Sequence, residues 1–245
     1  MSVIGFDTSN YTTSIAYFDG EQGVNFMCPH LYLYSMKGER KRDCPPTLSH
    51  QQPYWSQNKL FEDYSARLCY FATAGSTKGE VCVLTPIESD FIDAPVVDSG
   101  SEASPTWDRS MERILQQLMS LQVNSDLGDE QIIAETGSVE GKTFKIGEMA
   151  YQVVILPPML TIRPHTLKLL HAFAKQGGTI LVYDSYPQLV EGKEDFKAIE
   201  ELKSISTLVS KNTLKDAVEK GCDRVFSIEG EKKELVWSHL REVKG

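Results

Sequence analysis

The sequence has no stretch that approaches the roughly 20 consecutive apolar residues of a membrane-spanning helix. Its N-terminus also lacks the basic segment and apolar core of a secretory signal. Positive charge is in deficit, since 25 Lys and Arg face 34 Asp and Glu, for a formal net charge of -9. An acidic surface disfavours nonspecific binding to nucleic acid or anionic membranes. We therefore expect no nucleic-acid partner, no membrane partner and a cytoplasmic location.

Cysteine and histidine are too dispersed to indicate a disulfide framework or a metal site. The five cysteines form no Cys-x-x-Cys pair, and the five histidines form no His-x-x-x-His pair. His165 and His171 are six residues apart, which puts them on different faces of one helix. We expect reduced thiols that pack as small apolar groups, with no metal and no other cofactor.

From residue 79 onward, short apolar strands alternate with amphipathic segments. The pattern predicts strands at 80–87, 130–137, 151–158, 179–184, 223–228 and 234–240, with a small hairpin at 138–151. A helix is expected at 163–178, with Pro164 in its first turn and Gly177–Gly178 as its stop. Such alternation indicates a mostly parallel sheet covered on both faces. The predicted fold class is an α/β, flavodoxin-like (glutaminase-like) three-layer domain.

The stretch VIGFDTSNYTTSIAYFDG, residues 3–20, has the pattern of a hairpin with small hydroxyl and amide residues at its turn. Such a turn offers backbone N–H groups to a phosphate, and Asp7 is placed to hold a metal-bound water. The stretch resembles the start of the tRNA threonylcarbamoyl-adenosine synthases, which have an actin-like ATPase fold. The resemblance implies nucleotide binding. The chain has no second acidic hairpin of the DxGT kind, so a nucleotide-binding protein is the third of our functional hypotheses.

A longer pattern follows at residues 23–71, GVNFMCPHLYLYSMKGERKRDCPPTLSHQQPYWSQNKLFEDYSARLCYF. It resembles the end of the catalytic barrel in large bacterial α-L-rhamnosidase-like glycoside hydrolases. In that family a last barrel strand leads into YSxxGxRKRDxPP, then HQPWW-like residues, then a helix with DYxARLSY. The resemblance continues at 80–89 and 146–170 and extends over most of the chain beyond its first 20 residues. It implies a partial barrel segment followed by an accessory domain.

These patterns predict three parts. Residues 1–75 hold the hairpin, a barrel-end remnant, a Pro-rich loop and a helix. Residues 79–228 form the flavodoxin-like accessory domain. Residues 229–245 begin a truncated C-terminal β segment.

The loop after the expected barrel strand contains the residues best suited to contact a sugar. Sugar sites combine aromatic platforms for the apolar ring faces with hydrogen-bond groups for the hydroxyls. Active sites of barrels lie at the C-terminal ends of the strands, where this loop begins. Our candidates for carbohydrate contact are His30, Tyr34, Arg40, His50, Gln51 and Trp55.

Carboxyl groups are scarce in the same loop. Glycoside cleavage usually needs two, about 5–5.5 Å apart for retention or about 6.5–9.5 Å apart for inversion. Only Glu39 and Asp43 are available there, and the basic run GERKRD around them favours ionisation, which suits a general acid poorly. They are the only catalytic candidates. Whether the chain is an enzyme is left open; if active, it would hydrolyse O-glycosidic bonds.

The leading hypothesis is a carbohydrate-active protein of the glycosyl-hydrolase type, rhamnosidase-like, present as an incomplete or accessory fragment, with a carbohydrate substrate or glycan as partner. The second is a non-catalytic oligomerisation or scaffold domain, and a homo-oligomer is left open. Acyl-transfer chemistry has little basis, because the turn after 151–158 carries no Cys or Ser nucleophile.

Overall fold

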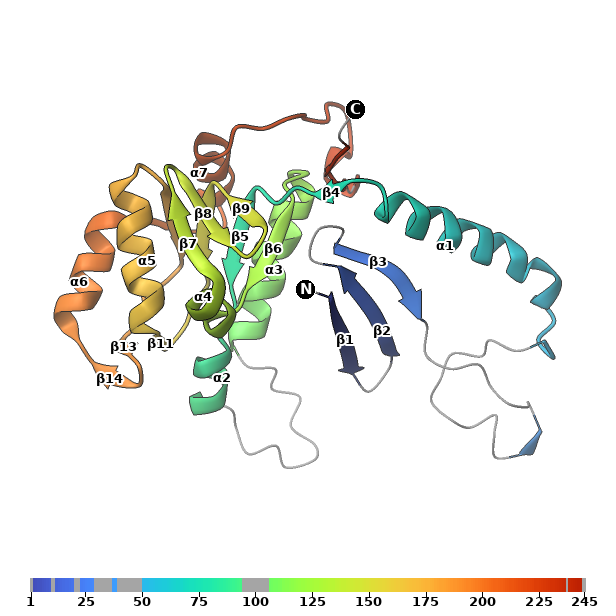
Figure 1. Cartoon of the computed structure of the whole chain (residues 1–245), viewed down its shortest axis with the longest axis horizontal. Helices are drawn as coiled ribbons and strands as arrows, with labels where there is room; N and C mark the ends of the chain where they lie inside the picture. The colour runs from blue at the N-terminus through green and yellow to red at the C-terminus, as the bar shows by residue number, and fades with distance from the viewer. Residues whose placement is uncertain are drawn as a thin grey trace. The chain divides into compact units, whose positions relative to one another are not determined.

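The computed structural model describes residues 2–9, 12–19, 23–28, 37–38, 50–93, 106–236 and 238–243. Contacts divide the chain into two compact units, one of residues 1–77 with 241–245 and one of residues 78–240. Figure 1 shows the helices and strands of each unit. In the part of the chain that the structure describes, no helix is both long and apolar enough to cross a membrane.

The first unit begins with an antiparallel sheet. Strands β1 (Ser2–Ser9) and β2 (Thr12–Asp19) form the predicted hairpin, and β3 (Gly23–Cys28) pairs antiparallel with β2. Thr8 and Ser9, expected in the turn, instead lie in the ladder opposite Thr13 and Thr12. In a (β/α)8 barrel, neighbouring strands are parallel. The antiparallel pairing of β3 with β2 differs from that pattern and does not support a barrel. The assignment of β3 to a barrel end stays a prediction.

The rest of the first unit is helical, with one short pair of strands. A 3-10 turn, η2 (Trp55–Gln57), leads into helix α1 (Asn58–Ala72), where the sequence predicts a helix. Strand β4 (Ser76–Thr77) then pairs antiparallel with β16 (Arg241–Glu242), so the end of the chain returns to this unit. The Arg241 side chain strengthens that return by donating hydrogen bonds to the carbonyl oxygens of Ala74 and Gly75.

The second unit is built on a five-stranded sheet with the order β15-β12-β10-β5-β6, in which every neighbouring pair is parallel. In chain order this is 2-1-3-4-5, one of the common orders of doubly wound sheets. The five strands are β5 (Val81–Leu84), β6 (Ser125–Gly128), β10 (Val153–Leu156), β12 (Thr179–Tyr183) and β15 (Thr207–Val209). The predicted α/β fold with a mainly parallel sheet is confirmed.

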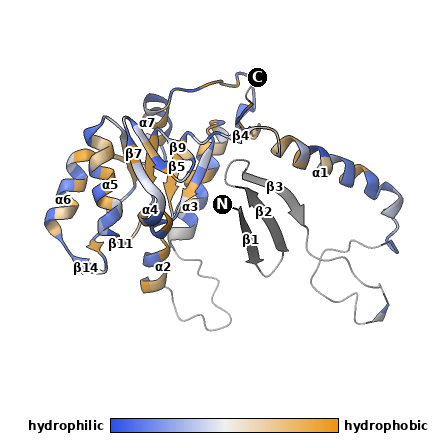
Figure 2. Ribbon diagram, viewed as in Figure 1, coloured by the Kyte–Doolittle hydropathy of each residue, from blue (hydrophilic) through white to orange (hydrophobic). Residues whose placement is uncertain are grey.

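Helices cover both faces of this sheet, which makes three layers. They are α2 (Ile87–Asp93), α3 (Thr106–Ser120), α4 (Glu130–Thr136), α5 (Pro164–Lys175), α6 (Phe196–Ile205) and α7 (Leu214–Gly221). Smaller elements are β7 (Gly137–Glu140), β8 (Thr143–Ile146), β9 (Met149–Tyr151), β11 (Thr161–Ile162), β13 (Leu189–Val190), β14 (Lys193–Glu194) and η3 (Lys233–Leu235). Figure 2 shows the hydrophobic residues gathered on the central strands.

Alternate side chains along each buried strand enter two separate cores. On β10, Val154 and Leu156 join a cluster with residues of α4, α5, α6 and β8. Val153 and Ile155 join another cluster with residues of α3 and α7. All four side chains are fully buried. Because successive residues of a strand point to opposite faces, a strand buried on both faces must be apolar throughout.

The strand expected at 130–137 is wrong. The strand ends earlier, at Gly128, and residues 130–136 form α4 instead. Asp129 causes the change, because its carboxylate accepts hydrogen bonds from the N–H groups of Gln131 (2.8 Å) and Ile132 (2.9 Å). Such an N-cap satisfies donors that the first helical turn leaves open and is worth about 1 kcal/mol. The hairpin expected at 138–151 is a three-stranded meander, β7-β8-β9.

Helix α5 ends where the sequence predicts. Gly177 adopts a φ of +85°, and the N–H of Gly178 donates to the carbonyl of Phe173 at 2.9 Å. A Cβ at Gly178 would lie 2.2 Å from the Phe173 ring, so glycine is needed there for close packing as well. This glycine pair is a C-terminal stop that leads directly into β12.

The strands expected at 223–228 and 234–240 are absent from the residues described there. Residues 222–236 run as irregular chain and the 3-10 turn η3. Their apolar side chains at Val225 and Leu235 are 71% and 70% exposed, so no sheet forms on them. The Gln122 amide holds this segment by donating to the carbonyl oxygens of Lys233 (2.8 Å) and Val236 (3.2 Å).

We expect Phe173→Ala to lower the free energy of unfolding by about 3–5 kcal/mol, the usual loss for a large aromatic in a packed core. Phe173 is fully buried and meets the Phe144 ring edge-on, with 5.5 Å between the centroids. Urea unfolding followed by circular dichroism measures the change. The matched control is Phe196→Ala, whose side chain is 73% exposed and which should shift stability by less than about 0.5 kcal/mol. Equal losses in both variants would contradict this core.

Candidate functional site

Three of the predicted sugar-contact residues lie in the segment just before α1. The N–H of Trp55 donates to the carbonyl of Gln52 at 3.0 Å, and the N–H of Gln57 donates to that of Tyr54 at 2.9 Å. Tyr54 and Trp55 lie in these two turns, and their side chains are 46% and 37% exposed. His50 is also exposed, two residues before the turn begins. The segment thus presents two aromatic rings with an imidazole and amides beside them in sequence.

Of the predicted sugar-contact residues, His50, Gln51 and Trp55 lie in this segment, within six residues of one another. His30, Tyr34 and Arg40 lie outside the described residues, and so do both catalytic candidates, Glu39 and Asp43. All of these assignments therefore stay predictions.

The carboxylates described nearest to this segment lie on α1 and have structural partners. Asp63 accepts a hydrogen bond from the Lys59 ammonium at 2.8 Å and 2.7 Å, one turn earlier. This hydrogen bond is the main cause that lowers the pKa of Asp63 below its usual value, and the charges of Lys59 and Arg67 add to it. Glu62 accepts a hydrogen bond from the Asn58 amide at 3.0 Å. A carboxyl held ionised is a poor general acid, so Asp63 does not fit that role in glycoside cleavage.

In the second unit, a ligand would be expected where the strand order reverses, at the carboxyl ends of β5 and β10. Among the described residues, the protein's own groups engage part of this edge. The Ser89 hydroxyl, fully buried on α2, accepts hydrogen bonds from the N–H groups of Leu160 (2.9 Å) and Thr161 (3.2 Å) in the segment after β10. Two backbone donors that a phosphate would use are thereby engaged by α2.

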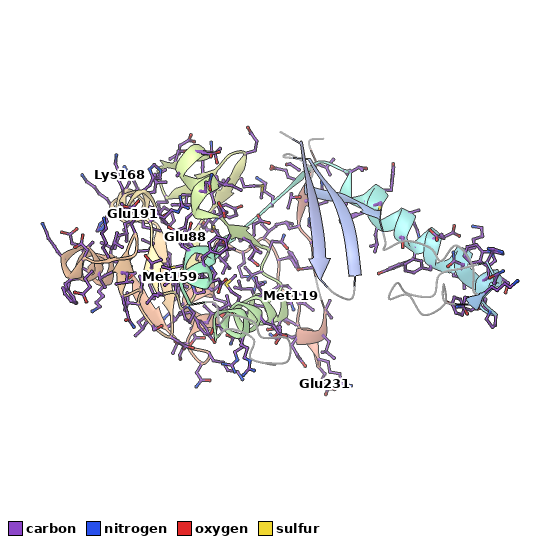
Figure 3. The ribbon with its side chains drawn as sticks, turned by 90° about the horizontal axis from the view of Figure 1, so that it is seen from below. Glu88, Met119, Met159, Lys168, Glu191 and Glu231 are labelled. Atoms are coloured by element: carbon purple, nitrogen blue, oxygen red, sulfur yellow. The ribbon has the colours of Figure 1, made fainter. Side chains whose placement is uncertain are left out.

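An ion-pair network lies beside Ser89 at the same edge. Arg163 donates from Nε to the Glu88 carboxylate at 2.6 Å, and its backbone N–H donates to Glu130 at 2.8 Å. Figure 3 labels Glu88 and the buried Met159 at this end of the sheet. Glu130 is only 2% exposed, and burial raises its pKa, while the Arg163 hydrogen bond opposes the rise. The network connects α2, α4 and the start of α5, and its role is to hold these helices in place.

The cysteines of the second unit are packing groups, as the sequence predicts. Cys82 is fully buried on β5, and burial, with the Asp126 charge, raises the pKa of its thiol. Burial likewise raises the pKa of Cys222 to about 12. Only the thiolate is a nucleophile, so neither group is poised for catalysis. Asp126 accepts a hydrogen bond from the Tyr151 hydroxyl at 3.0 Å, which occupies its carboxylate.

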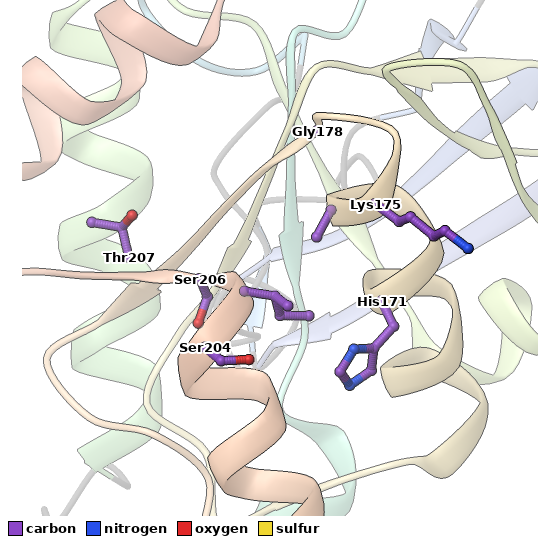
Figure 4. Close-up of a pocket in the computed structure, with 8 residues that line it drawn as sticks. His171, Lys175, Gly178, Ser204, Ser206 and Thr207 are labelled. Atoms are coloured by element: carbon purple, nitrogen blue, oxygen red, sulfur yellow. The ribbon is translucent and has the colours of Figure 1, made fainter.

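One open pocket of about 640 Å³ lies between the C-terminal ends of α5 and α6 and the starts of β12 and β15. Its lining includes His171, Lys175, Gly178, Ser204, Ser206 and Thr207, which Figure 4 labels. His171 lies 3.9 Å from the carboxylate of Glu201 on α6. The lining holds no carboxyl pair of the kind that glycoside cleavage requires. Among the described residues, no group of three or more His, Cys, Asp or Glu could hold a metal ion.

No family model and no curated protein matches this sequence. Solved structures resemble it at low identity. They include an exo-carrageenase GH42 from Bacteroides ovatus (13% identity, TM-score 0.42), a β-galactosidase from Rahnella sp. R3 (14%, 0.47) and a rhamnosidase from Novosphingobium sp. PP1Y (16%, 0.42). These matches cover 66%, 68% and 70% of this chain, but only 19%, 23% and 16% of those proteins. The solved structures are glycoside hydrolases, and likeness at this level assigns no activity to the chain.

Replacing Glu130 by Gln should flatten the dependence of stability on pH. A carboxyl whose pKa is raised by folding contributes stability below its unfolded pKa and loses it as pH rises through the folded pKa. The unfolding free energy of the native chain should therefore fall, relative to Glu130→Gln, as the pH rises from about 4.5 toward neutral. Urea unfolding across this range measures it. Glu219→Gln, at an exposed position on α7, is the matched control, and identical pH profiles for Glu130→Gln and the native chain would contradict the assignment.

Proposed function

We propose that this chain is a carbohydrate-active component of the glycosyl-hydrolase type, rhamnosidase-like, whose second unit is a flavodoxin-like accessory domain. The observation that supports the proposal is the segment at 50–57, where the predicted contact residues His50, Gln51 and Trp55 lie close together in sequence and are exposed. An exposed ring beside hydrogen-bond groups matches the apolar faces and hydroxyl rims of sugars. The sequence resemblance at 23–71 supports the same class.

In this proposal the second unit takes no part in bond cleavage. Its C-terminal sheet edge is engaged in part by the Ser89 and Arg163 contacts, and its cysteines are buried. Sugar contact is assigned to the first unit, with Arg40, His30 and Tyr34 as further contacts. Any catalytic carboxyl would be Glu39 or Asp43. The cytoplasm is the proposed location.

A second candidate function, a non-catalytic oligomerisation or scaffold domain, is favoured by one specific observation. Helix α1 exposes large apolar side chains along one side, and exposed apolar patches commonly mark interaction surfaces. The two functions are compatible, since a sugar-binding accessory part can also assemble.

We expect the purified chain to bind methyl α-L-rhamnoside or methyl β-D-galactoside, and Trp55→Ala to weaken that binding tenfold or more. A buried aromatic side chain contributes about 1.5–3 kcal/mol, and about 1.4 kcal/mol is a factor of ten in affinity. Saturation-transfer NMR and calorimetry measure binding. Tyr70→Ala removes an 80% exposed ring outside the 50–57 segment and should leave affinity unchanged. Affinity that survives in Trp55→Ala would remove this ring from the site.

A panel of aryl glycosides, rhamnosides and galactosides foremost, tests whether the chain also cleaves. We expect no turnover, because the described residues beside the 50–57 segment offer no carboxyl suited to be the acid. The same assay is run on Glu39→Gln and Asp43→Asn. Turnover by the native chain that either variant loses would show a working carboxylate and overturn the accessory assignment.

A further inference from the structure

Helix α1 exposes its large apolar side chains, while several of its small side chains are covered. Ala72 is buried and Ser65 and Cys69 are half-buried. By contrast, the side chains of Leu60, Phe61, Tyr64, Leu68 and Phe71 are 69%, 46%, 56%, 42% and 50% exposed. A helix normally turns its large apolar residues inward. The exposed side of α1 is therefore shaped for contact with a further surface.

The exposed residues form a single stripe. Phe61, Tyr64 and Leu68 are three and four positions apart, which places them one above another on the same helix face. Figure 2 shows hydrophobic and hydrophilic residues on different sides of α1. A helix of 15 residues is about 22 Å long, so the stripe has the length of a short helix-pairing seam.

Two opposite charges flank this stripe. Asp63 and Arg67 are four residues apart, with Ser65 midway between them, and both lie on the side of the stripe away from Ala72. In an antiparallel pair of α1 helices centred on Ser65, each Asp63 faces the Arg67 of the other copy. In a parallel pair about a two-fold axis, the charged flanks of the two copies would lie on opposite sides of the seam and would not meet. The flank is thus complementary to itself in one orientation only.

We propose that α1 pairs antiparallel with α1 of a second copy of this chain, about a two-fold axis that crosses the exposed stripe at the level of Ser65 along the helix. The contact buries Phe61, Tyr64 and Leu68 from each copy and sets Asp63 against Arg67 twice. Such an isologous interface uses the same patch on both partners. The proposal rests on the second candidate function, oligomerisation, and is independent of sugar contact, because it uses α1 and leaves the 50–57 segment aside.

A single helix pair is smaller than the standard interface of roughly 1,600 Å², so a reversible dimer is expected. Sedimentation equilibrium of the full chain from about 1 to about 200 µM should show a monomer–dimer equilibrium, a range that corresponds to about -8 to -5 kcal/mol. A monomer throughout this range would overturn the proposal.

Matched tyrosine variants locate the contact on the helix. Tyr64→Ala should weaken dimerisation at least tenfold, and Leu68→Glu should abolish it within the same concentration range. Tyr70→Ala, which removes an 80% exposed ring a third of a turn away from Tyr64, should change it less than threefold. Circular dichroism confirms that each variant is folded. A dimer unaffected by Tyr64→Ala and Leu68→Glu would use another surface and would also overturn the proposal.

Charge reversal tests the orientation. Asp63→Arg and Arg67→Asp should each weaken the dimer at least fivefold, because each sets like charges against one another twice. The double variant Asp63→Arg/Arg67→Asp restores both cross-pairs and should return the dissociation constant to within threefold of the native value. Failure of the double variant to recover, in a folded chain, would exclude the antiparallel register.

Discussion

The second unit depends on strands that are buried on both faces at once. Val153 to Leu156 of β10 have no exposed face, and alternate residues enter two cores that do not share members. A parallel strand in this position cannot carry a polar side chain without an internal partner. Polar and charged side chains are therefore found at the ends of the strands. Hydrogen bonds and ion pairs between side chains can form there.

At the carboxyl edge of the sheet, the hydrogen bonds and the ion pair of these polar groups connect helices to one another. Ser89 engages the N–H groups of the segment after β10, and Arg163 links Glu88 to Glu130. In ligand-binding sheets of this kind the corresponding space receives a substrate or cofactor. In this chain, residues of α2 and α4 and the residue that precedes α5 bind one another there. The accessory role that we propose for this unit is compatible with these contacts, which engage the Ser89 hydroxyl and the Glu88 and Glu130 carboxylates within the chain.

Much of the fold could be predicted from local pattern. The apolar runs at β5, β10 and β12, the helix α1 and the Gly177 stop of α5 all depend on residues a few positions apart. The error at 130–137 came from reading Ile132 and Ile133 as strand residues when Asp129 caps a helix. The errors after residue 222 came from apolar residues that never meet a sheet. The site stays a prediction: His50, Gln51 and Trp55 lie close together in sequence just before α1, and the other candidates lie outside the described residues.

The fold class could be inferred from the sequence alone, because burial on two faces requires apolar strands and covering helices require periodic apolar residues. The sequence also places aromatic and hydrogen-bonding side chains at residues 50–57, whose contact with a sugar stays a prediction. Only the tertiary structure decided that Glu88 meets Arg163 across 75 positions of the chain. It also decided that α1 covers Ala72 while exposing Phe61 and Tyr64. Such outcomes depend on which surfaces meet in space, and local periodicity carries no information about that.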